Sequence, residues 1–488
     1  MSNLKEIFKK VFKSKVLHYV FSRYATYFIQ FINSIFIAVY LGPYYLGVWG
    51  FITLIIQYLN QINFGIAHSV NVIIAVHKDK HWYVQKVIGT SITMLIMLSI
   101  LVAIFFAANE LFQLQIGDKY NFSQYAPVVL LIGIFGYFNQ LMSNIFRVYG
   151  QIIEIAFNQS SVPILILLTI ILYNNSENLL WVLVLANLFA FLTSFMLYLL
   201  RCPVKFKPIF VGRLMKTIQI KGWYLFVYNT SFYLIIISTR SFISGYYSVE
   251  EFGYFTFAFS LANAVLLLLE SLSFLIYPKL INRLFSATEK QAVTLLEMVR
   301  DAYISTSHLL IHFAIFLFPF FLLLFPQYNN SAVTFKMCAL TVVLYTNSFG
   351  YSSLLISKGF EKKLGFLSLS IFIINIVLVF VLIEFFNVSF SFVISATMAS
   401  YFLYVFTIGY FGRKMLELKT NFLGLLKDIF PLRLFIPFFL SLYLIIIFSN
   451  NLYFILPLIV FIIMNFGIFK KIKKIINYAI LNPEFSNI

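Results

Sequence analysis

The chain has 488 residues, of which 61% are hydrophobic, 19% aromatic and 11% charged. An ordinary globular domain carries about 25% charged residues, so this composition excludes a soluble enzyme with a single membrane anchor. Apolar runs of about 20 residues recur from residue 16 to the end of the chain, which predicts an all-α polytopic membrane protein. With only two cysteines, the chain has no disulfide framework and no four-thiolate metal site.

About 14 transmembrane helices are predicted from the apolar segments. The last two segments are the least regular, because Arg433 lies at the edge of one and the turn between them is short. The segments cover residues 16–40, 46–76, 87–108, 125–147, 152–173, 179–200, 222–247, 252–278, 302–325, 335–357, 365–384, 391–412, 433–449 and 453–469.

The basic residues are distributed unevenly between the two predicted sides of the membrane. If the N-terminus is cytoplasmic, 31 of the 35 Lys and Arg residues lie on cytoplasmic segments. Cytoplasmic loops of membrane proteins are rich in Lys and Arg, so we expect both termini in the cytoplasm. The net charge of +18 is then a topology signal, and we expect contact with membrane lipids and no nucleic-acid partner.

An internal repeat divides the chain into two parts. Residues 40–49 align with residues 246–255, and in both a long helix ends, a tight outside turn follows, and Gly-x-aromatic opens the next helix. The repeat predicts two parallel six-helix lobes around a central cavity, plus two C-terminal helices. The predicted domains are an N-terminal lobe (1–200), a basic cytoplasmic linker (201–221), a C-terminal lobe (222–412), and two additional helices with a basic cytoplasmic tail (413–488).

Polar side chains recur on single faces of the first, second, fourth, seventh and eighth segments. Such faces are costly against lipid, and we expect them to line the cavity and bind substrate. Two alternatives stay open: Asn and Gln can bridge neighbouring helices, and the arginines can snorkel to the membrane surface. The candidate residues are Arg23, Tyr27, Gln30, Gln57, Asn60, Gln61, Asn139, Asn229, Tyr233, Arg240 and Asn263.

Glu270 is the one carboxylate deep within a predicted helix. Arg23 and Glu270 lie at similar distances from the basic residues that mark the inner boundary, on helices of different lobes. Opposite charges at equal depth commonly pair, so we expect Arg23 and Glu270 to form a cytoplasmic gate. His308 and His312 are spaced for a metal, but no third ligand is near, and we expect no metal site.

Motifs for catalysis are missing from the sequence. There is no phosphate-binding loop, nucleophile elbow or H-E-x-x-H motif, and no outside loop exceeds about 16 residues. We therefore expect a transporter and not an enzyme, without a cofactor, and leave H+ or Na+ coupling open.

The region from Arg23 to Val76, with its Tyr40-Leu41-Gly42-Pro43 turn and Asn63-Phe64-Gly65, resembles the start of Wzx-type O-antigen and capsular polysaccharide flippases. These belong to the multidrug/oligosaccharidyl-lipid/polysaccharide (MOP, MATE-like) exporter superfamily. Arg147-x-x-Gly150 and Lys358-Gly359-Phe360 fit the same pattern. The resemblance covers the first twelve segments, and the last two helices are an addition found in some members.

The resemblance implies a flippase in the bacterial inner membrane that moves an undecaprenyl-diphosphate-linked oligosaccharide to the outer leaflet by alternating access. It also implies work beside a polysaccharide polymerase and a chain-length regulator, for O-antigen (lipopolysaccharide) or capsule. This chain departs from the pattern in having few intramembrane cations. The alternatives are a cation-coupled drug antiporter of the same fold and a membrane polysaccharide polymerase. Two intramembrane arginines against one carboxylate favour an anionic substrate.

Overall fold

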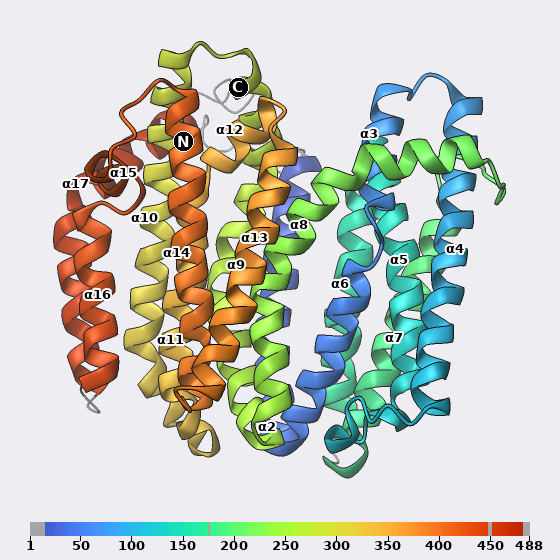
Figure 1. The fold of residues 1–488 in the computed structure, drawn as a ribbon, viewed down its shortest axis with the longest axis horizontal. Helices are drawn as coiled ribbons and strands as arrows, with labels where there is room; N and C mark the ends of the chain where they lie inside the picture. The colour runs from blue at the N-terminus through green and yellow to red at the C-terminus, as the bar shows by residue number, and fades with distance from the viewer. Residues whose placement is uncertain (1–14, 174–175, 448–450, 482–488) are drawn as a thin grey trace, which may run out of the picture. The chain divides into compact units, whose positions relative to one another are not determined.

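The computed structural model describes residues 15–173, 176–447 and 451–481. Throughout these residues the regular structure is helical, and no strand is formed. Figure 1 shows long helices lying side by side within each half of the chain. A helix satisfies its own backbone hydrogen bonds, which is what a chain this apolar needs within lipid. The protein is an all-α, multi-pass membrane protein, as predicted.

Within the described residues, each of the fourteen predicted apolar segments falls mainly on helices. The first half contains α2 (Lys15–Gln61), α3 (Ile66–Val76), α4 (His81–Leu111), η1 (Asp118–Tyr120), η2 (Phe122–Gln124), α5 (Ala126–Val148), α6 (Ile152–Leu172) and α7 (Ser176–Leu200). The second half contains α8 (Gly212–Tyr246), α9 (Val249–Ser286), α10 (Glu289–Leu322), η3 (Pro326–Ser331), α11 (Ala332–Leu344), η4 (Tyr345–Ser348), α12 (Tyr351–Ser357), α13 (Glu361–Glu384), α14 (Phe390–Met415), α15 (Phe422–Ile429), α16 (Leu432–Ile447), η5 (Asn451–Phe454) and α17 (Ile455–Leu481).

Two glycines interrupt the helices that carry the first two predicted segments. Gly42 has a φ of 68° beside Pro43, so α2 kinks where an outside turn is predicted. Gly65 has a φ of 78° and precedes α3, so the segment 46–76 is two helices and the prediction of one is wrong. A left-handed glycine breaks the helical backbone without interrupting the apolar run from which the segment was predicted.

The tenth predicted segment is also broken. It consists of α11, η4 and α12, and the helices on either side of the break are bent by 41°. Gly350, at the break, has a φ of 87°. A Cβ at Gly350 would lie 2.9 Å from both Leu296 Cδ2 and Arg300 Cγ of α10, so glycine is required for this close approach.

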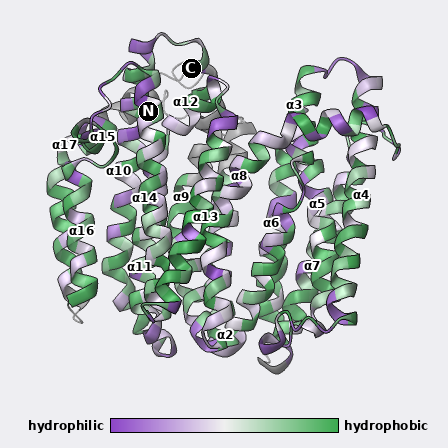
Figure 2. Cartoon of the chain, viewed as in Figure 1, coloured by the Kyte–Doolittle hydropathy of each residue, from purple (hydrophilic) through white to green (hydrophobic). Residues whose placement is uncertain are grey.

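Nine of the described helices are long and apolar enough to cross a membrane, or eleven if each of two bent pairs is one span. α2 counts once although it carries parts of two predicted segments, and α8, with Asn229 and Arg240 along its length, is not among them. Figure 2 shows hydrophobic residues along most of the long helices.

The chain divides into two compact units. Unit 1 is Met1–Thr230 with Ser248–Gly253, and unit 2 is Ser231–Tyr247 with Tyr254–Ile488. In unit 1, α6 packs against α2 and α7, and α5 packs against α7. In unit 2, α14 packs against α11 and α13, and α17 packs against α10 and α16. α8 therefore begins in unit 1 and ends in unit 2.

The basic segment after α7 lies along α4. The Thr93 hydroxyl donates to the Ile209 carbonyl at 2.9 Å, and the Ile209 amide donates to the Gly89 carbonyl at 3.4 Å. A Cβ at Gly89 would lie 2.2 Å from the Lys207 carbonyl oxygen, so this packing requires glycine. α8 begins at Gly212, before the predicted apolar boundary, because exposed basic residues end an apolar run without ending a helix.

Candidate substrate site

Arg23 lies on α2 in unit 1, on the polar face that the sequence predicts. Its Nη1 donates to Gln159 Oε1 on α6 at 2.6 Å, and its Nη2 donates to the Tyr27 hydroxyl. The guanidinium carbon lies 4.6 Å from the centre of the Tyr27 ring. Arg23 thus reaches sideways from α2 to α6, and its cavity-lining role stays a prediction.

The charge of Arg23 is not paired with any carboxylate that the structure describes. Among the described residues, none is within ion-pair distance of this guanidinium, and its Nε is buried without a hydrogen-bond partner. A cation in a membrane-spanning helix is costly when it is not neutralised. The two polar partners orient the guanidinium without neutralising it, so the arrangement suits an anionic ligand.

Several other candidates of unit 1 bridge helices. Asn139 Nδ2 donates to the Phe191 carbonyl on α7 at 2.9 Å. Asn60 faces α5, because its Oδ1 lies 2.5 Å from where a Cβ at Gly136 would be. Gln61 accepts a weak hydrogen bond of 3.5 Å from the Thr230 hydroxyl. For Asn139 in particular, the structure favours the bridging alternative, since its amide is engaged by a backbone carbonyl.

Gln30, Gln57, Asn229 and Tyr233 are partly exposed along their helices. No described contact assigns them to substrate, and their cavity-lining role stays a prediction.

Arg240 is buried in unit 2. Only 2% of the residue is exposed, and its guanidinium carbon lies 4.9 Å from the centre of the Phe259 ring on α9. Asn263 Nδ2 donates to the Phe259 carbonyl at 2.8 Å. The Asn263 hydrogen bond lies within α9 and engages the backbone of Phe259, whereas Arg240 contacts the Phe259 ring. A cation over an aromatic face is stabilised by the ring quadrupole.

A hydrogen-bond hub around Asn375 of α13 supports the turn of α8 that carries Arg240. Asn375 Nδ2 lies within donating distance of the Ile235 carbonyl (2.8 Å) and of the Ser238 and Thr239 hydroxyls (both 3.1 Å). Ser400 of α14 donates to Asn375 Oδ1 at 3.1 Å. Sequence reasoning missed this hub, because a single Asn in an apolar segment carries no periodic signal.

The predicted gate partner Glu270 has its side chain outside the described residues. The Arg23–Glu270 gate stays a prediction.

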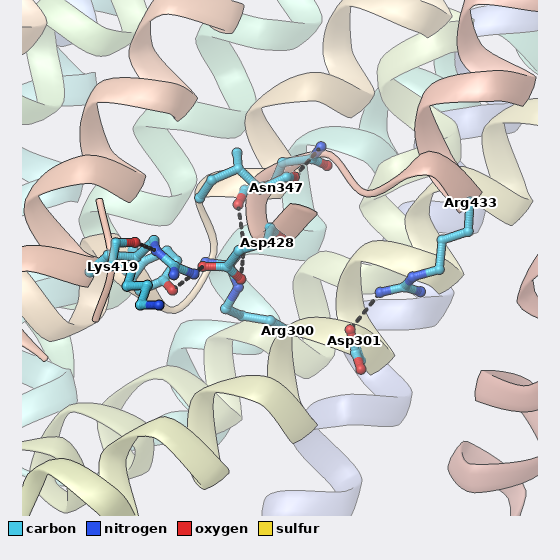
Figure 3. A network of polar contacts seen from close by, with 9 residues as sticks. Arg300, Asp301, Asn347, Lys419, Asp428 and Arg433 are labelled. Carbon is cyan, nitrogen blue, oxygen red and sulfur yellow. Dashed lines mark hydrogen bonds and ion pairs between the residues drawn. The ribbon is translucent and has the colours of Figure 1, made fainter. Parts of the chain in front are cut away.

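A charged network in unit 2 was not predicted as a site. Asp428 of α15 forms an ion pair with Arg413 of α14 at 3.0 Å and a longer one with Arg300 of α10 at 3.9 Å. The Tyr351 hydroxyl also donates to the Asp428 carboxylate, and the Arg300 guanidinium carbon lies 4.0 Å from the Tyr351 ring centre. Figure 3 shows Arg300 and Asn347 on either side of Asp428.

Arg300 is 3% exposed and is held mainly by carbonyl oxygens. Its Nη2 donates to the Asn347 carbonyl at 3.3 Å and to the Asp428 carbonyl at 3.4 Å, while its Nη1 is buried without a partner. Asn347 lies in the break between α11 and α12 and also contacts His308 Nε2 at 3.0 Å. The network therefore joins α10, the broken helix, α14 and α15.

Arg433 fastens the two C-terminal helices to α10 (Figure 3). Its Nη2 forms an ion pair with Asp301 at 2.6 Å, and its Nη1 donates to Ser305 at 2.8 Å and to Asn465 Oδ1 of α17 at 3.0 Å. Asn465 in turn donates to the Arg433 carbonyl at 3.0 Å.

The predicted start of the ninth span explains why the two networks were missed. The apolar segment begins at 302, so Arg300 and Asp301 were assigned to a cytoplasmic loop. In the structure α10 begins at Glu289, and both residues lie well inside the helix. A helix continues past the end of its apolar stripe wherever its polar residues find partners.

No protein-family model matches this chain, and neither does any curated protein. Solved structures do match. An inward-facing multidrug resistance MATE family transporter of the MOP superfamily is 14% identical with a TM-score of 0.68, covering 82% of this chain and 98% of that one. The lipid II flippase MurJ, in an inward closed conformation, is 13% identical with a TM-score of 0.68, covering 93% and 98%. A mutant of the Vibrio cholerae MATE transporter VcmN is 15% identical with a TM-score of 0.55, covering 87% and 100%.

Identities this low establish the fold alone. The chain has the fold of these MOP-superfamily transporters. The matches do not establish the more specific resemblance to Wzx-type flippases.

Proposed function

We propose that this protein is a flippase for a lipid-diphosphate-linked oligosaccharide, which it moves from the cytoplasmic to the outer leaflet of a bacterial inner membrane. The observation that carries the proposal is Arg23, a cation on a membrane-spanning helix that is held by Gln159 and Tyr27 without a carboxylate among the described residues. The fold shared with the lipid II flippase MurJ supports it.

The chemistry of the substrate fits these side chains. A diphosphate cannot cross hydrocarbon without neutralisation, and the arginine fork binds phosphate oxygens in a bidentate manner. Sugar hydroxyls need hydrogen-bond partners, which the amides of Gln30, Gln57 and Asn229 would offer. Alternating access would carry the headgroup across while the lipid tail stays in the bilayer. The proposed product is a repeat unit for O-antigen or capsule, consumed by a polymerase working with a chain-length regulator.

A cation-coupled antiporter is the second candidate, because the MATE transporter matches with the same TM-score as MurJ. Exchange of a cationic drug for H+ or Na+ would use a free carboxylate within the membrane. In the described part of unit 2, Asp428 and Asp301 are already paired with arginines. This pairing favours the anionic substrate over the drug.

Reconstitution tests the proposal. Liposomes would contain the purified protein and a fluorescent polyprenyl-diphosphate oligosaccharide, and a membrane-impermeant quencher would report its arrival in the other leaflet. We expect the wild type to equilibrate the two leaflets and Arg23→Gln to slow this at least about tenfold, since a hydrogen bond to a charged group contributes about 1.5–3 kcal/mol.

Arg213→Gln is the matched control, because Arg213 is an exposed cation at the start of α8; its rate should equal that of the wild type. Ethidium efflux by the same vesicles without lipid transfer would reject the flippase in favour of the antiporter.

A further inference from the structure

The short helix α15 is sharply bent away from the axis of α16, the helix that follows it. α15 has eight residues and is bent by 78° from α16. α16 and α15 together have the length and apolarity of one broken span. Since α16 carries the apolar run that would cross the membrane, a bend of this size turns α15 nearly parallel to the membrane surface. α15 lies at the end of unit 2 where α14 ends, and this end is predicted to be cytoplasmic.

One face of α15 is locked onto unit 2. Ile429 is fully buried and packs against α14 where Gly409 has no side chain, since a Cβ there would lie 2.1 Å from Ile429 Cδ1. Asn347 Nδ2 donates to the Ile429 carbonyl at 3.2 Å, and Asp428 is held by Arg413 at 3.0 Å. These contacts come from α14 and η4, so they set which face of α15 points outward.

The outward face is apolar and is flanked by lysines. Phe422 is 71% exposed and Leu423 is 64% exposed. Lys427 on α15 and Lys419 just before it are exposed. The acidic residue of α15, Asp428, is turned inward onto the arginines. The outward face of α15 thus has apolar side chains with lysines beside them, and the one carboxylate of the helix points inward. Such a face is complementary to a membrane surface, where anionic headgroups cover the acyl chains.

We propose that α15 is an interfacial helix that binds the anionic phospholipids of the cytoplasmic leaflet. Phe422 and Leu423 enter the boundary between headgroups and acyl chains, and Lys419 and Lys427 contact the lipid phosphates. The Asp428 network gives the helix its orientation, because it holds the opposite face against α10 and α14. This proposal does not depend on the proposed transport activity.

The first part of α8 carries a similar combination of residues. Lys221 lies in the first part of α8, just before the predicted apolar segment 222–247. There, too, a cation lies beside exposed apolar residues, because Ile220 is 59% exposed and Trp223 is 42% exposed. α8 and α15 therefore both present an exposed lysine beside exposed apolar side chains just before an apolar segment, which fits an interfacial position.

Spin labels test where α15 lies. The full-length protein, with Cys202 replaced by serine, would carry a nitroxide at Leu423→Cys or, as the water-exposed control, at Glu417→Cys, and would be placed in bilayers without other proteins. We expect the label at 423 to collide with oxygen more than with a water-soluble nickel complex, and the label at 417 to do the reverse. Equal nickel access at both positions would overturn the proposal and assign the apolar edge to a soluble partner protein.

Lipid retention tests the headgroup contacts. Protein extracted from vesicles of phosphatidylglycerol and phosphatidylcholine would be titrated with phosphatidylglycerol by native mass spectrometry. Lys419→Gln combined with Lys427→Gln should weaken binding about 25-fold, at about fivefold for each lysine near an anionic surface.

Lys362→Gln combined with Lys363→Gln is the matched control, because both are exposed lysines of α13 in the same unit. Binding by the α15 variant that equals binding by this control would overturn the proposal.

Discussion

Gly47 and Gly253 occupy equivalent positions in the two repeats, and each is the site of the same backbone contact. A Cβ at Gly47 would lie 2.0 Å from the Val249 carbonyl oxygen, and a Cβ at Gly253 would lie 1.9 Å from the Pro43 carbonyl oxygen. The 206-residue offset that relates the two glycines also relates Pro43 to Val249. The contact is therefore reciprocal within unit 1, as expected when two copies of one motif pack about a local symmetry axis.

Gly253→Ala is predicted to destabilise the protein. The added methyl group would meet backbone atoms, which cannot rotate away, and overpacking of this kind costs about 1–3 kcal/mol. We expect a lower midpoint of thermal unfolding in detergent. Gly245→Ala is the control, since a Cβ at Gly245 meets nothing within 4 Å. A Gly253→Ala protein as stable as this control would contradict the contact.

Asp428→Asn is predicted to be strongly destabilising. Removal of its charge leaves the buried Arg300 and the largely buried Arg413 without their carboxylate, and the loss of one partner of a buried ion pair costs about 3–5 kcal/mol. The comparison is Asp301→Asn. Its side chain is 44% exposed, so solvent screens its charge, and we expect a loss of about 1 kcal/mol or less. Thermal unfolding of the two variants side by side would measure the difference, and equal losses would contradict the burial argument.

Arg240→Lys is predicted to keep the fold and lose transport. Lysine retains a cation over the Phe259 ring but lacks the planar fork that phosphate oxygens need. Arg240→Ala should also lose packing, because Arg240 is buried. Measuring lipid transfer and the midpoint of unfolding on the same preparations separates the two effects. Wild-type transfer by the lysine variant would show that Arg240 acts through packing alone.

Cys202 is predicted to react slowly with maleimides. Burial raises the pKa of the Cys202 thiol above that of an ordinary cysteine. At neutral pH less thiolate is present, so the rate should keep rising at pH values where an exposed cysteine has levelled off. Gly212→Cys, at an exposed position nearby, supplies the reference rate. Identical pH profiles would contradict the burial of the thiol.

The apolar pattern determined the fold class and the approximate location of the long apolar helices. A helix that crosses lipid needs about 20 apolar residues, so each span can be predicted from one continuous stretch of sequence. The repeat was also readable, because the helix exit, the turn and the glycine of each copy are contiguous. Arg23 and Arg240 were found for the same reason: a cation stands out within an apolar run.

The breaks and the short surface helix could not be predicted in this way. The break near Gly350 leaves the apolar run unbroken, and α15 has only eight residues, too few to show a period. The start of α10 was placed too late, since Arg300 ends the apolar stripe but not the helix.

The sequence by itself determined which residues are predicted to enter the membrane, because a stretch of about 20 apolar residues is enough to identify a membrane-crossing helix. Only the tertiary structure decided what each charge meets there. Arg23 finds Gln159, 136 positions away, and Arg300 finds Asp428, 128 positions away. A side chain in hydrocarbon must take its partner from whichever helix packs beside it, and helix packing brings together residues whose separation along the chain carries no local signal.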